Sequence, residues 1–300
     1  MHKFKIWINA ARLRTLPLSL SCVVIGTSLA LKENIFNSKI FLFSILTTIA
    51  LQILSNFAND YGDFSKNTDN ENRVGPTRTL QSGLITKAKM KIAIVITALI
   101  SLLFGSILIF LSIENISNIL IFYFLGFFAI ASALFYTIGK NPYGYSGFGD
   151  LFVFIFFGLI GVIGNYFLQT NNFKFEIILP AITIGSLAVG VLNLNNMRDF
   201  ENDKSSNKNT IVVKIGLRNA KYYHLLLICI SILSSFLYFA FFHNTTNLYT
   251  MHIMLLSFLI LHLPTIFRID SNKLDSQLKY LALFSFAYSI IFTLQIIILK

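Results

Sequence analysis

The sequence has few charged residues and a large excess of apolar ones. Charged side chains make up 12% of its 300 residues and hydrophobic side chains 55%, whereas about a quarter of the residues in a soluble domain are charged. This composition excludes a soluble domain of any size. It predicts an integral membrane protein whose apolar residues lie within the bilayer.

Cysteine and histidine are scarce as well. The two cysteines, Cys22 and Cys229, both fall inside apolar runs, which leaves no disulfide framework and no cysteine-based metal site. The five histidines lack the spacing of a metal site, and we interpret them as ordinary packing or interface residues. They are His2, His224, His243, His252 and His262.

Long apolar runs separated by polar loops predict an all-α bundle of about nine transmembrane helices. Each run is close to the roughly 20 residues that a helix needs to cross the hydrocarbon core. The runs cover residues 15–31, 38–58, 89–112, 117–137, 150–169, 177–197, 220–242, 249–267 and 277–298. We expect a single polytopic membrane domain over residues 1–300, with a central cavity open to the cytoplasmic side.

The basic residues indicate how this bundle is oriented. An odd number of spans divides the loops into two sets, and the set that includes the N-terminus contains 20 of the 24 Lys and Arg residues. Because cytoplasmic loops carry the excess of Lys and Arg, we expect this set to face the cytoplasm from a plasma (inner) membrane. The net charge of +11 then needs no nucleic acid to explain it.

The cytoplasmic segments predicted in this way contain every motif of interest. They are the loops 59–91, 138–150 and 198–221, preceded by residues 1–14. The first fourteen residues mix basic with apolar side chains and suit a helix lying on the inner leaflet. The loops on the opposite side are short, so we expect function to reside on the cytoplasmic face.

Seven of the thirteen acidic residues fall in two short segments, one after the second predicted span and one after the sixth. Polar side chains repeat there at intervals of four: Asn59, Asp63 and Asn67 in the first segment, and Asn195, Asp199 and Asp203 in the second. On a helix each set forms one stripe of oxygen ligands. Both spans run in the same direction, so we expect the stripes to meet at the mouth of the cavity.

Carboxylate and amide oxygens without histidine or cysteine are hard ligands that suit Mg²⁺. Mg²⁺ keeps several waters and completes its shell with phosphate oxygens of a substrate. Two opposed stripes therefore match a diphosphate held through two metal ions. The alternative is that both segments are solvated helix ends with capping Asp and Asn side chains, but ionisable residues next to apolar spans favour a functional site.

Basic residues near these segments are candidate phosphate contacts. Arg73 and Arg78 flank Gly75 and Pro76, which fix a turn between them, and arginine binds phosphate in a planar, bidentate manner. Lesser candidates are Lys140, Arg198 and Lys204. The remaining lysines of this region are interpreted as contacts to lipid headgroups: Lys87, Lys89 and Lys91.

A third loop, residues 141–150, combines glycines with aromatic side chains such as Tyr145 and ends at Asp150. This composition suits a lid or an aromatic wall of a substrate site. An ordinary turn with interfacial tyrosines explains it equally well.

The first acidic segment resembles a motif of the UbiA superfamily of intramembrane prenyltransferases. That motif reads N-D-x-x-D-x-x-x-D, and here Asn59, Asp60 and Asp63 match it, while Asn67 stands in place of the last Asp. The residues that follow are similar to the branch of the superfamily that prenylates 1,4-dihydroxy-2-naphthoate, in which Asp69 takes the place of the displaced Asp. The third loop and the run from Asn195 to Asp203 are similar to that branch too.

The resemblance implies the transfer of a polyprenyl group from polyprenyl diphosphate to 1,4-dihydroxy-2-naphthoate, with loss of CO₂ and diphosphate, to give demethylmenaquinone. It implies two Mg²⁺ ions, with Mn²⁺ as a substitute, and a tail lying in membrane lipid. The metal ligands are then Asn59, Asp60, Asp63, Asn195, Asp199 and Asp203. The substrate-binding residues are Asn56, Arg73, Arg78, Tyr145, Asp150 and Arg198. The catalytic candidates are Asp63, Asp69, Asp199, Asp203 and Lys204, of which Asp69 and Lys204 lie near the acceptor.

Other functions stay open at this point. A prenyltransferase of another branch acts on an acceptor such as 4-hydroxybenzoate or homogentisate. A divalent cation transporter also places carboxylates in a helical bundle, but ideally near the membrane midplane, whereas these carboxylates fall at the ends of predicted spans. A CDP-alcohol phosphotransferase needs a D-G-x-x-A-R run, which the sequence lacks.

Overall fold

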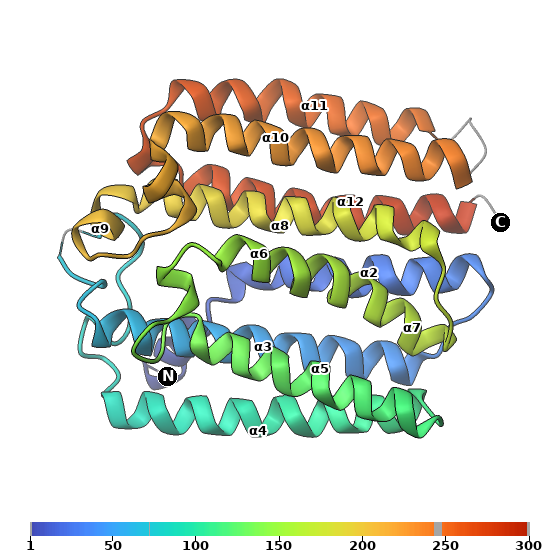
Figure 1. Cartoon of the computed structure of the whole chain (residues 1–300), viewed down its shortest axis with the longest axis horizontal. Coiled ribbons are helices and arrows are strands. Elements are labelled where there is room, and N and C mark those ends of the chain that lie inside the picture. Colours follow the sequence, from blue (N-terminus) through green and yellow to red (C-terminus); the bar gives the residue numbers. More distant parts are fainter. Residues whose placement is uncertain (1, 72, 243–247, 299–300) are drawn as a thin grey trace.

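Long helices lying side by side make up the protein (Figure 1). The structure is a computed structural model that describes residues 2–71, 73–242 and 248–298, and these residues contain no strand. Within these described ranges, eight helical segments are long and apolar enough to cross a membrane: Phe4–Lys32, Ser38–Ser65, Lys87–Ser112, Ile116–Phe135, Gly149–Thr170, Phe175–Arg198, Ile211–Phe242 and Asp275–Ile298. The predicted all-α, multi-pass membrane architecture is confirmed.

The eighth of the nine predicted spans, residues 249–267, corresponds to helix α11, Leu248–Arg268. Its fully described part, Ile253–Arg268, counts as a shorter apolar helix. The number of nine crossings therefore stays a prediction. The N-terminal helix and the C-terminal end of α12 lie at opposite ends of the bundle (Figure 1), as an odd number of crossings requires.

The helices on the N-terminal side begin at recognisable capping residues. Asn37 accepts hydrogen bonds from two backbone N–H groups at the start of α3, Ser38–Ser65. Thr86 caps α4, Lys87–Ser112, and Asn115 caps α5, Ile116–Phe135, in the same manner. Such caps satisfy N–H groups that have no partner within the helix. Helix α3 continues about two turns beyond the predicted end at residue 58, and these turns contain the first acidic motif.

The first helix, α1, His2–Ala11, is separated from α2, Leu16–Lys32, by a short 3-10 turn, Leu13–Thr15. Arg12 lies between them with φ 49°, in the left-handed region that a non-glycine residue seldom adopts. The resulting bend directs the chain from α1 into the bundle. Phe4 at the start of α1 is exposed, while Ala11 at its end is buried.

The span after the third loop is not a uniform α-helix. It consists of α6, Gly149–Val153, a π-helical stretch η3, Phe154–Ile163, and α7, Gly164–Thr170. π-Helical turns are rare and occur mostly near functional sites. A side chain at Gly158 would meet the Ala181 carbonyl oxygen at 2.7 Å. This glycine therefore allows η3 to lie directly against the helix that contains Ala181, Ile178–Arg198.

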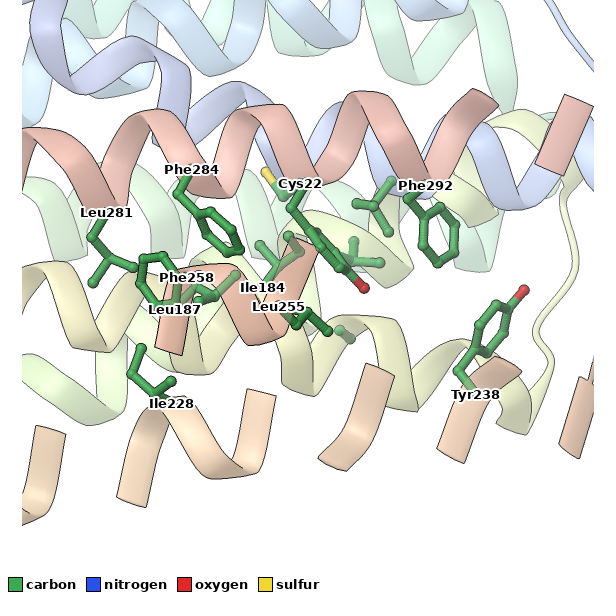
Figure 2. Packing of buried hydrophobic residues seen from close by; sticks show 14 of the residues in the cluster. Cys22, Ile184, Leu187, Ile228, Tyr238, Leu255, Phe258, Leu281, Phe284 and Phe292 are labelled. Atoms are coloured by element: carbon green, nitrogen blue, oxygen red, sulfur yellow. The ribbon is translucent and has the colours of Figure 1, made fainter. Parts of the chain in front are cut away.

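The C-terminal half contains α8, Ile178–Arg198, the short α9, Phe200–Ser205, then α10, Ile211–Phe242, α11, and α12, Asp275–Ile298. A break at Gly216, φ 80°, interrupts α10 and leaves the membrane-crossing part close to the predicted span. Figure 2 shows the apolar core of this half, where Leu281, Phe284 and Phe292 of α12 pack with side chains of the neighbouring helices.

Two histidines in this half form a pair that the sequence spacing did not reveal. The Nε2 atoms of His224 on α10 and His262 on α11 lie 2.8 Å apart, and His262 Nδ1 lies 3.0 Å from Gln277 Oε1 on α12. Both rings are buried. The prediction that these histidines are packing residues agrees with their burial.

Candidate active site

A cavity of about 420 Å³ runs through the bundle and is lined mainly by residues of α2 to α9. Its mouth lies at the end of the bundle that carries the long loops and α9 (Figure 1). Charged and amide side chains line this mouth, and apolar side chains line the inner part. The inner part extends to Leu108 and Leu168, which lie near the C-terminal ends of α4 and α7. The cavity therefore joins a polar entrance to an apolar interior.

Hydrogen bonds between chain segments lie next to Leu168, which lines the inner end of the cavity. The Asn37 N–H donates to Gln169 Oε1 at 2.8 Å, and Gln169 Nε2 donates to the Asn37 carbonyl at 3.2 Å. Beside this pair, Asn171 Nδ2 donates to the Ser112 carbonyl at 2.7 Å, and the Ser112 hydroxyl donates to the Leu168 carbonyl. We refer to these five residues as the inner plug.

The first acidic motif presents only one side of α3 to the cavity. Asn56, Asn59 and Asp63 line the cavity, as positions three or four apart on one helical face should. Asp60 does not line it. Its carboxylate instead forms an ion pair with Arg12 and lies 3.3 Å from Arg78 Nη1. This placement argues against the predicted role of Asp60 as a metal ligand.

The predicted stripe on α3 ends before Asn67. The helix ends at Ser65, and Asn67 adopts a left-handed conformation, φ 57°, with an exposed side chain. The chain then turns back so that Asp69 is buried and lines the cavity, with its Oδ1 3.0 Å from Arg73 Nε. Asp69 therefore lines the mouth together with Asp63, and its role as the last Asp of the motif stays a prediction.

The second acidic motif retains the predicted stripe across the junction of α8 and α9. The Asp199 N–H donates to the Asn195 carbonyl at 3.1 Å, and the Asp203 N–H donates to the Asp199 carbonyl at 2.8 Å. All three side chains line the cavity. Arg198 donates through Nε and Nη2 to the two Asp199 oxygens at 2.8 and 2.7 Å and through Nη1 to Asp275 at 2.6 Å.

Two basic side chains connect the acidic motifs to each other. Arg73 contacts Asp69 and also reaches Asp199, with Nη2 3.6 Å from Oδ2. Lys208 Nζ lies 3.6 Å from Asp63 Oδ1 and 3.7 Å from Asp203 Oδ1. The expectation that the two motifs face each other across the cavity mouth therefore agrees with the structure.

Sequence reasoning missed Lys208 and Arg12, and it chose Lys204 in their place. Lys204 is exposed and does not line the cavity, which contradicts its predicted place beside the acceptor. Lys208 lines the cavity because the chain reverses at Asn207, φ 54°. An Asn directly after the end of a helix is a known reversal signal and is the one feature that indicates where Lys208 lies.

The third loop contributes a tyrosine contact and an aromatic wall. The Tyr145 hydroxyl donates to Asp63 Oδ1 at 2.8 Å. Tyr143 and Phe152 line the cavity and stack with ring centroids 4.0 Å apart, and Tyr136 meets Tyr143 edge-on at 5.4 Å. Asp150, predicted to bind substrate, is buried away from the cavity and faces Tyr223.

Burial shifts the pKa of several groups at the mouth. Burial, reinforced by the Asp63 carboxylate, raises the pKa of Asp69 to about 7. Burial also raises the pKa of Asp203 to about 7, although Lys208 opposes the change. For Asp199 burial favours the neutral form, but the hydrogen bonds and charge of Arg198 outweigh it and hold the pKa below its usual value. Asp69 and Asp203 therefore lose their protons, and become charged candidate metal ligands, near neutral pH.

The donor set at the mouth fits a hard divalent cation. No three Asp, Glu, His or Cys side chains converge on one point within the described ranges, but Mg²⁺ usually takes one or two carboxylates and completes its shell with water and substrate phosphate. Among the described residues, Asp203 Oδ2, Asn202 Oδ1 and Asp69 Oδ2 are buried without a hydrogen-bond partner. Buried oxygens of this kind are costly unless something satisfies them, and a cation with bound water does so.

The fold and this site define a class of molecule: a multi-pass membrane protein whose helices enclose a cavity with two acidic motifs at its mouth. The UbiA prenyltransferase family matches residues 19–290, and this chain belongs to that family. A 1,4-dihydroxy-2-naphthoate octaprenyltransferase from Haemophilus influenzae is 41% identical over 302 residues, which cover 99% of this chain and 97% of the relative. The resemblance inferred from the motifs is confirmed.

Two solved structures share the fold. The apo structure of a UbiA homolog from Aeropyrum pernix K1 has a TM-score of 0.69 at 16% identity and covers 96% of this chain and 98% of its own. A UbiA homolog from Archaeoglobus fulgidus, bound to DMAPP and Mg²⁺, has a TM-score of 0.63 at 13% identity, with 94% and 98% covered. At these identities the likeness shows the arrangement of helices.

Proposed function

We propose that this protein transfers a polyprenyl group from polyprenyl diphosphate to 1,4-dihydroxy-2-naphthoate, with loss of CO₂ and diphosphate, to give demethylmenaquinol, the reduced form of demethylmenaquinone. The observation that carries the proposal is the pair of acidic motifs facing each other at the mouth of an apolar cavity. A relative 41% identical over nearly the whole chain bears the name of an octaprenyltransferase for this acceptor. An acidic mouth next to an apolar cavity suits a substrate with a charged head and an apolar tail.

The residues that line both sides of the mouth are suited to hold Mg²⁺, in two ions, with Mn²⁺ as a substitute. The related protein from Archaeoglobus fulgidus binds DMAPP and Mg²⁺, which supports a divalent metal here. The ligands we propose are Asn59, Asp63, Asp69, Asn195, Asp199 and Asp203. When bound, such ions neutralise the diphosphate and stabilise the charge that develops on it as it leaves.

Arginines at the mouth complete the diphosphate site. Arg73 and Arg78 line the cavity beside Asp69, as does Arg12 beside α3. Guanidinium groups bind phosphate oxygens in a bidentate geometry. We propose that these three side chains exchange part of their pairing with aspartates for contacts to the diphosphate, which orients the C1 carbon of the tail toward the acceptor.

The aromatic wall assists bond cleavage. As the bond between C1 and the diphosphate oxygen breaks, positive charge develops on the allylic carbons, and the faces of Tyr143 and Phe152 attract such charge. Apolar walls keep water from the cation. The electron-rich ring of the acceptor then attacks C1 of the prenyl tail. The new bond forms at the ring carbon that bears the carboxylate. Loss of CO₂ returns the bonding electrons to the ring.

The orientation of the protein is part of the same proposal. The loops that form the mouth contain most of the Lys and Arg residues, and such loops face the cytoplasm in multi-pass proteins. We therefore propose that the protein lies in the plasma (inner) membrane with the mouth open to the cytoplasm. The acceptor then enters from the cytoplasm and the tail from the lipid phase.

A reconstituted assay tests the function directly. Purified protein in lipid vesicles is supplied with radiolabelled polyprenyl diphosphate and Mg²⁺, together with 1,4-dihydroxy-2-naphthoate, 4-hydroxybenzoate or homogentisate. We expect labelled, decarboxylated product with the first acceptor only, and no product when EDTA replaces Mg²⁺. Prenylation of another acceptor in preference would overturn the acceptor assignment, and full turnover in EDTA would overturn the metal assignment.

A further inference from the structure

Lys208 is a buried basic residue at the centre of the mouth. It follows α9 in the loop before α10, and its side chain is only 9% exposed. Its backbone N–H donates to the Asp203 carbonyl at 2.8 Å, which fixes the reversal that starts at Asn207. A lysine is seldom this buried unless opposite charges surround it.

The Lys208 ammonium lies between the two acidic motifs and close to the same distance from each. Nζ is 3.6 Å from Asp63 Oδ1 on α3 and 3.7 Å from Asp203 Oδ1 on α9. It also lies over the ring of Tyr145, 5.3 Å from the centroid. The ammonium thus stands between two carboxylates from opposite sides of the cavity, where a bridging cation is expected to bind.

The groups around this ammonium are held by hydrogen bonds from three loops. The Tyr145 hydroxyl contacts both Asp63 Oδ1, at 2.8 Å, and Thr68 Oγ1, at 2.6 Å. Asn202 Nδ2 donates to the Thr68 carbonyl at 2.8 Å, and the Asn209 N–H donates to the Tyr145 carbonyl at 3.0 Å. Because each loop is tied to the others, the position of Lys208 follows from the folded chain and does not require a ligand.

We infer that Lys208 is a positioning residue that acts as a built-in cation: it holds Asp63 and Asp203 together before substrate binds and competes with divalent metal for them. This inference rests on the proposed function, since it assigns the two carboxylates to the metal site. Two unit charges less than 4 Å apart in a partly buried site interact by several kcal/mol, so the ammonium weakens metal binding as long as it keeps both contacts.

The competition has a consequence for the order of binding. An incoming diphosphate offers the ammonium new oxygen partners, which releases the carboxylates to metal ions that arrive with the substrate. Metal and diphosphate therefore bind together more readily than metal alone. If Lys208 only stabilised the loop, its removal would weaken the binding of metal alone as well as the joint binding of metal and diphosphate.

Metal binding in the absence of prenyl donor and acceptor tests this inference. Free Mn²⁺ is titrated against the detergent-solubilised full-length protein and followed by electron paramagnetic resonance. We expect Lys208→Met, which keeps the stem of the side chain but removes its charge, to bind Mn²⁺ about tenfold more tightly than the wild type. We expect Lys208→Arg to keep the weak wild-type binding, and Lys89→Met, at an exposed position, to change nothing.

A second measurement distinguishes positioning from general stabilisation. In the prenyl transfer assay, Lys208→Met is expected to raise KM for the polyprenyl diphosphate, while Lys208→Arg restores it. Unchanged or weaker Mn²⁺ binding by folded Lys208→Met, confirmed with Lys208→Gln as a second neutral variant, would overturn the inference. Because the titration contains no prenyl donor, a wild type that binds Mn²⁺ but prenylates no acceptor would contradict the proposed function alone.

Discussion

Asp60 and Asp63 lie about one turn apart on α3, yet only Asp63 faces the cavity. Asp60 pairs with Arg12 and Arg78 instead, and its side chain is 1% exposed and does not line the cavity. Asp63 thus lines the cavity, while Asp60, three residues before it, holds two arginines in place. The two aspartates therefore have different roles, and their variants should behave differently.

The first prediction concerns these two aspartates. Asp63→Asn removes a ligand from the site that stabilises the leaving group, so kcat should fall by orders of magnitude in folded protein. Asp60→Asn leaves Arg12 and Arg78 without their shared partner, and breaking a buried pair costs about 3 to 5 kcal/mol. We expect a lower melting temperature but a kcat near that of the wild type. Equal losses of kcat in both variants would mean that Asp60 also reaches the metal.

The second acidic motif allows a parallel test. Asp199→Asn should reduce kcat as strongly as Asp63→Asn, because the two residues line opposite sides of one mouth. Steady-state kinetics in proteoliposomes provide the measurement, and the elution volume on gel filtration provides the control for folding. If either variant keeps a normal kcat, the two acidic motifs serve the structure of the mouth and do not hold the metal.

Arg78 should affect substrate binding more than chemistry. Arg78→Ala removes a contact to the diphosphate that is present in both the ground state and the transition state, so it should mainly raise KM for the prenyl donor. A hydrogen bond to a charged group contributes about 1.5 to 3 kcal/mol, which corresponds to roughly 10- to 150-fold in kcat/KM. Lys89→Ala, whose side chain is exposed, should leave both constants unchanged. A fall in kcat without a change in KM would place Arg78 at the reacting centre.

The raised pKa values of Asp69 and Asp203 predict how stability depends on pH. Both pKa values are about 7 in the folded protein and near 3.9 when unfolded, so the folded state binds more protons between these limits. The free energy of unfolding of the metal-free protein should therefore fall as pH rises from about 4 to 7. Melting curves in EDTA measure this fall, and Asp203→Asn should reduce it. Added Mg²⁺ should remove it, because the metal stabilises the charged carboxylates; a profile unaffected by Mg²⁺ would contradict this.

Membrane orientation is tested by cysteine labelling. Ser65 and Ser205 lie at the mouth and are exposed, as is Asn172 at the opposite end. In a background where Cys229, the exposed native cysteine, is replaced by serine, Ser65→Cys and Ser205→Cys should react with an impermeant maleimide only after the cells are opened. Asn172→Cys should react in intact cells. The reverse pattern would place the mouth on the outer side.

Much of the fold could be predicted from the sequence because the bilayer makes strict demands. A crossing helix must be long and apolar, so the ends of α2 and α5 fall within two residues of the predicted spans. The π-helical stretch η3 and the break at Gly216 were not predicted. They arise from packing between helices and from a backbone conformation at one residue, neither of which hydropathy reports.

The site was predicted where helical spacing determines it and missed where loops determine it. Asp199 and Asp203 face the cavity because the four-residue repeat continues into α9. Lys204 and Lys208 differ only in which side of a chain reversal they occupy, and that reversal depends on the left-handed conformation of Asn207. Charge and spacing alone do not reveal such a reversal.

The inner plug has a consequence for the membrane as a whole. The cavity reaches from its polar mouth to Leu108 and Leu168, and the reciprocal hydrogen bonds of Asn37 with Gln169 tie together the chain segments next to its inner end. We expect these contacts to keep the cavity from becoming a continuous pore. A cell that stores energy as an ion gradient would lose it through an open passage of that kind. The protein gains room for a long lipid tail and still keeps the bilayer electrically insulating.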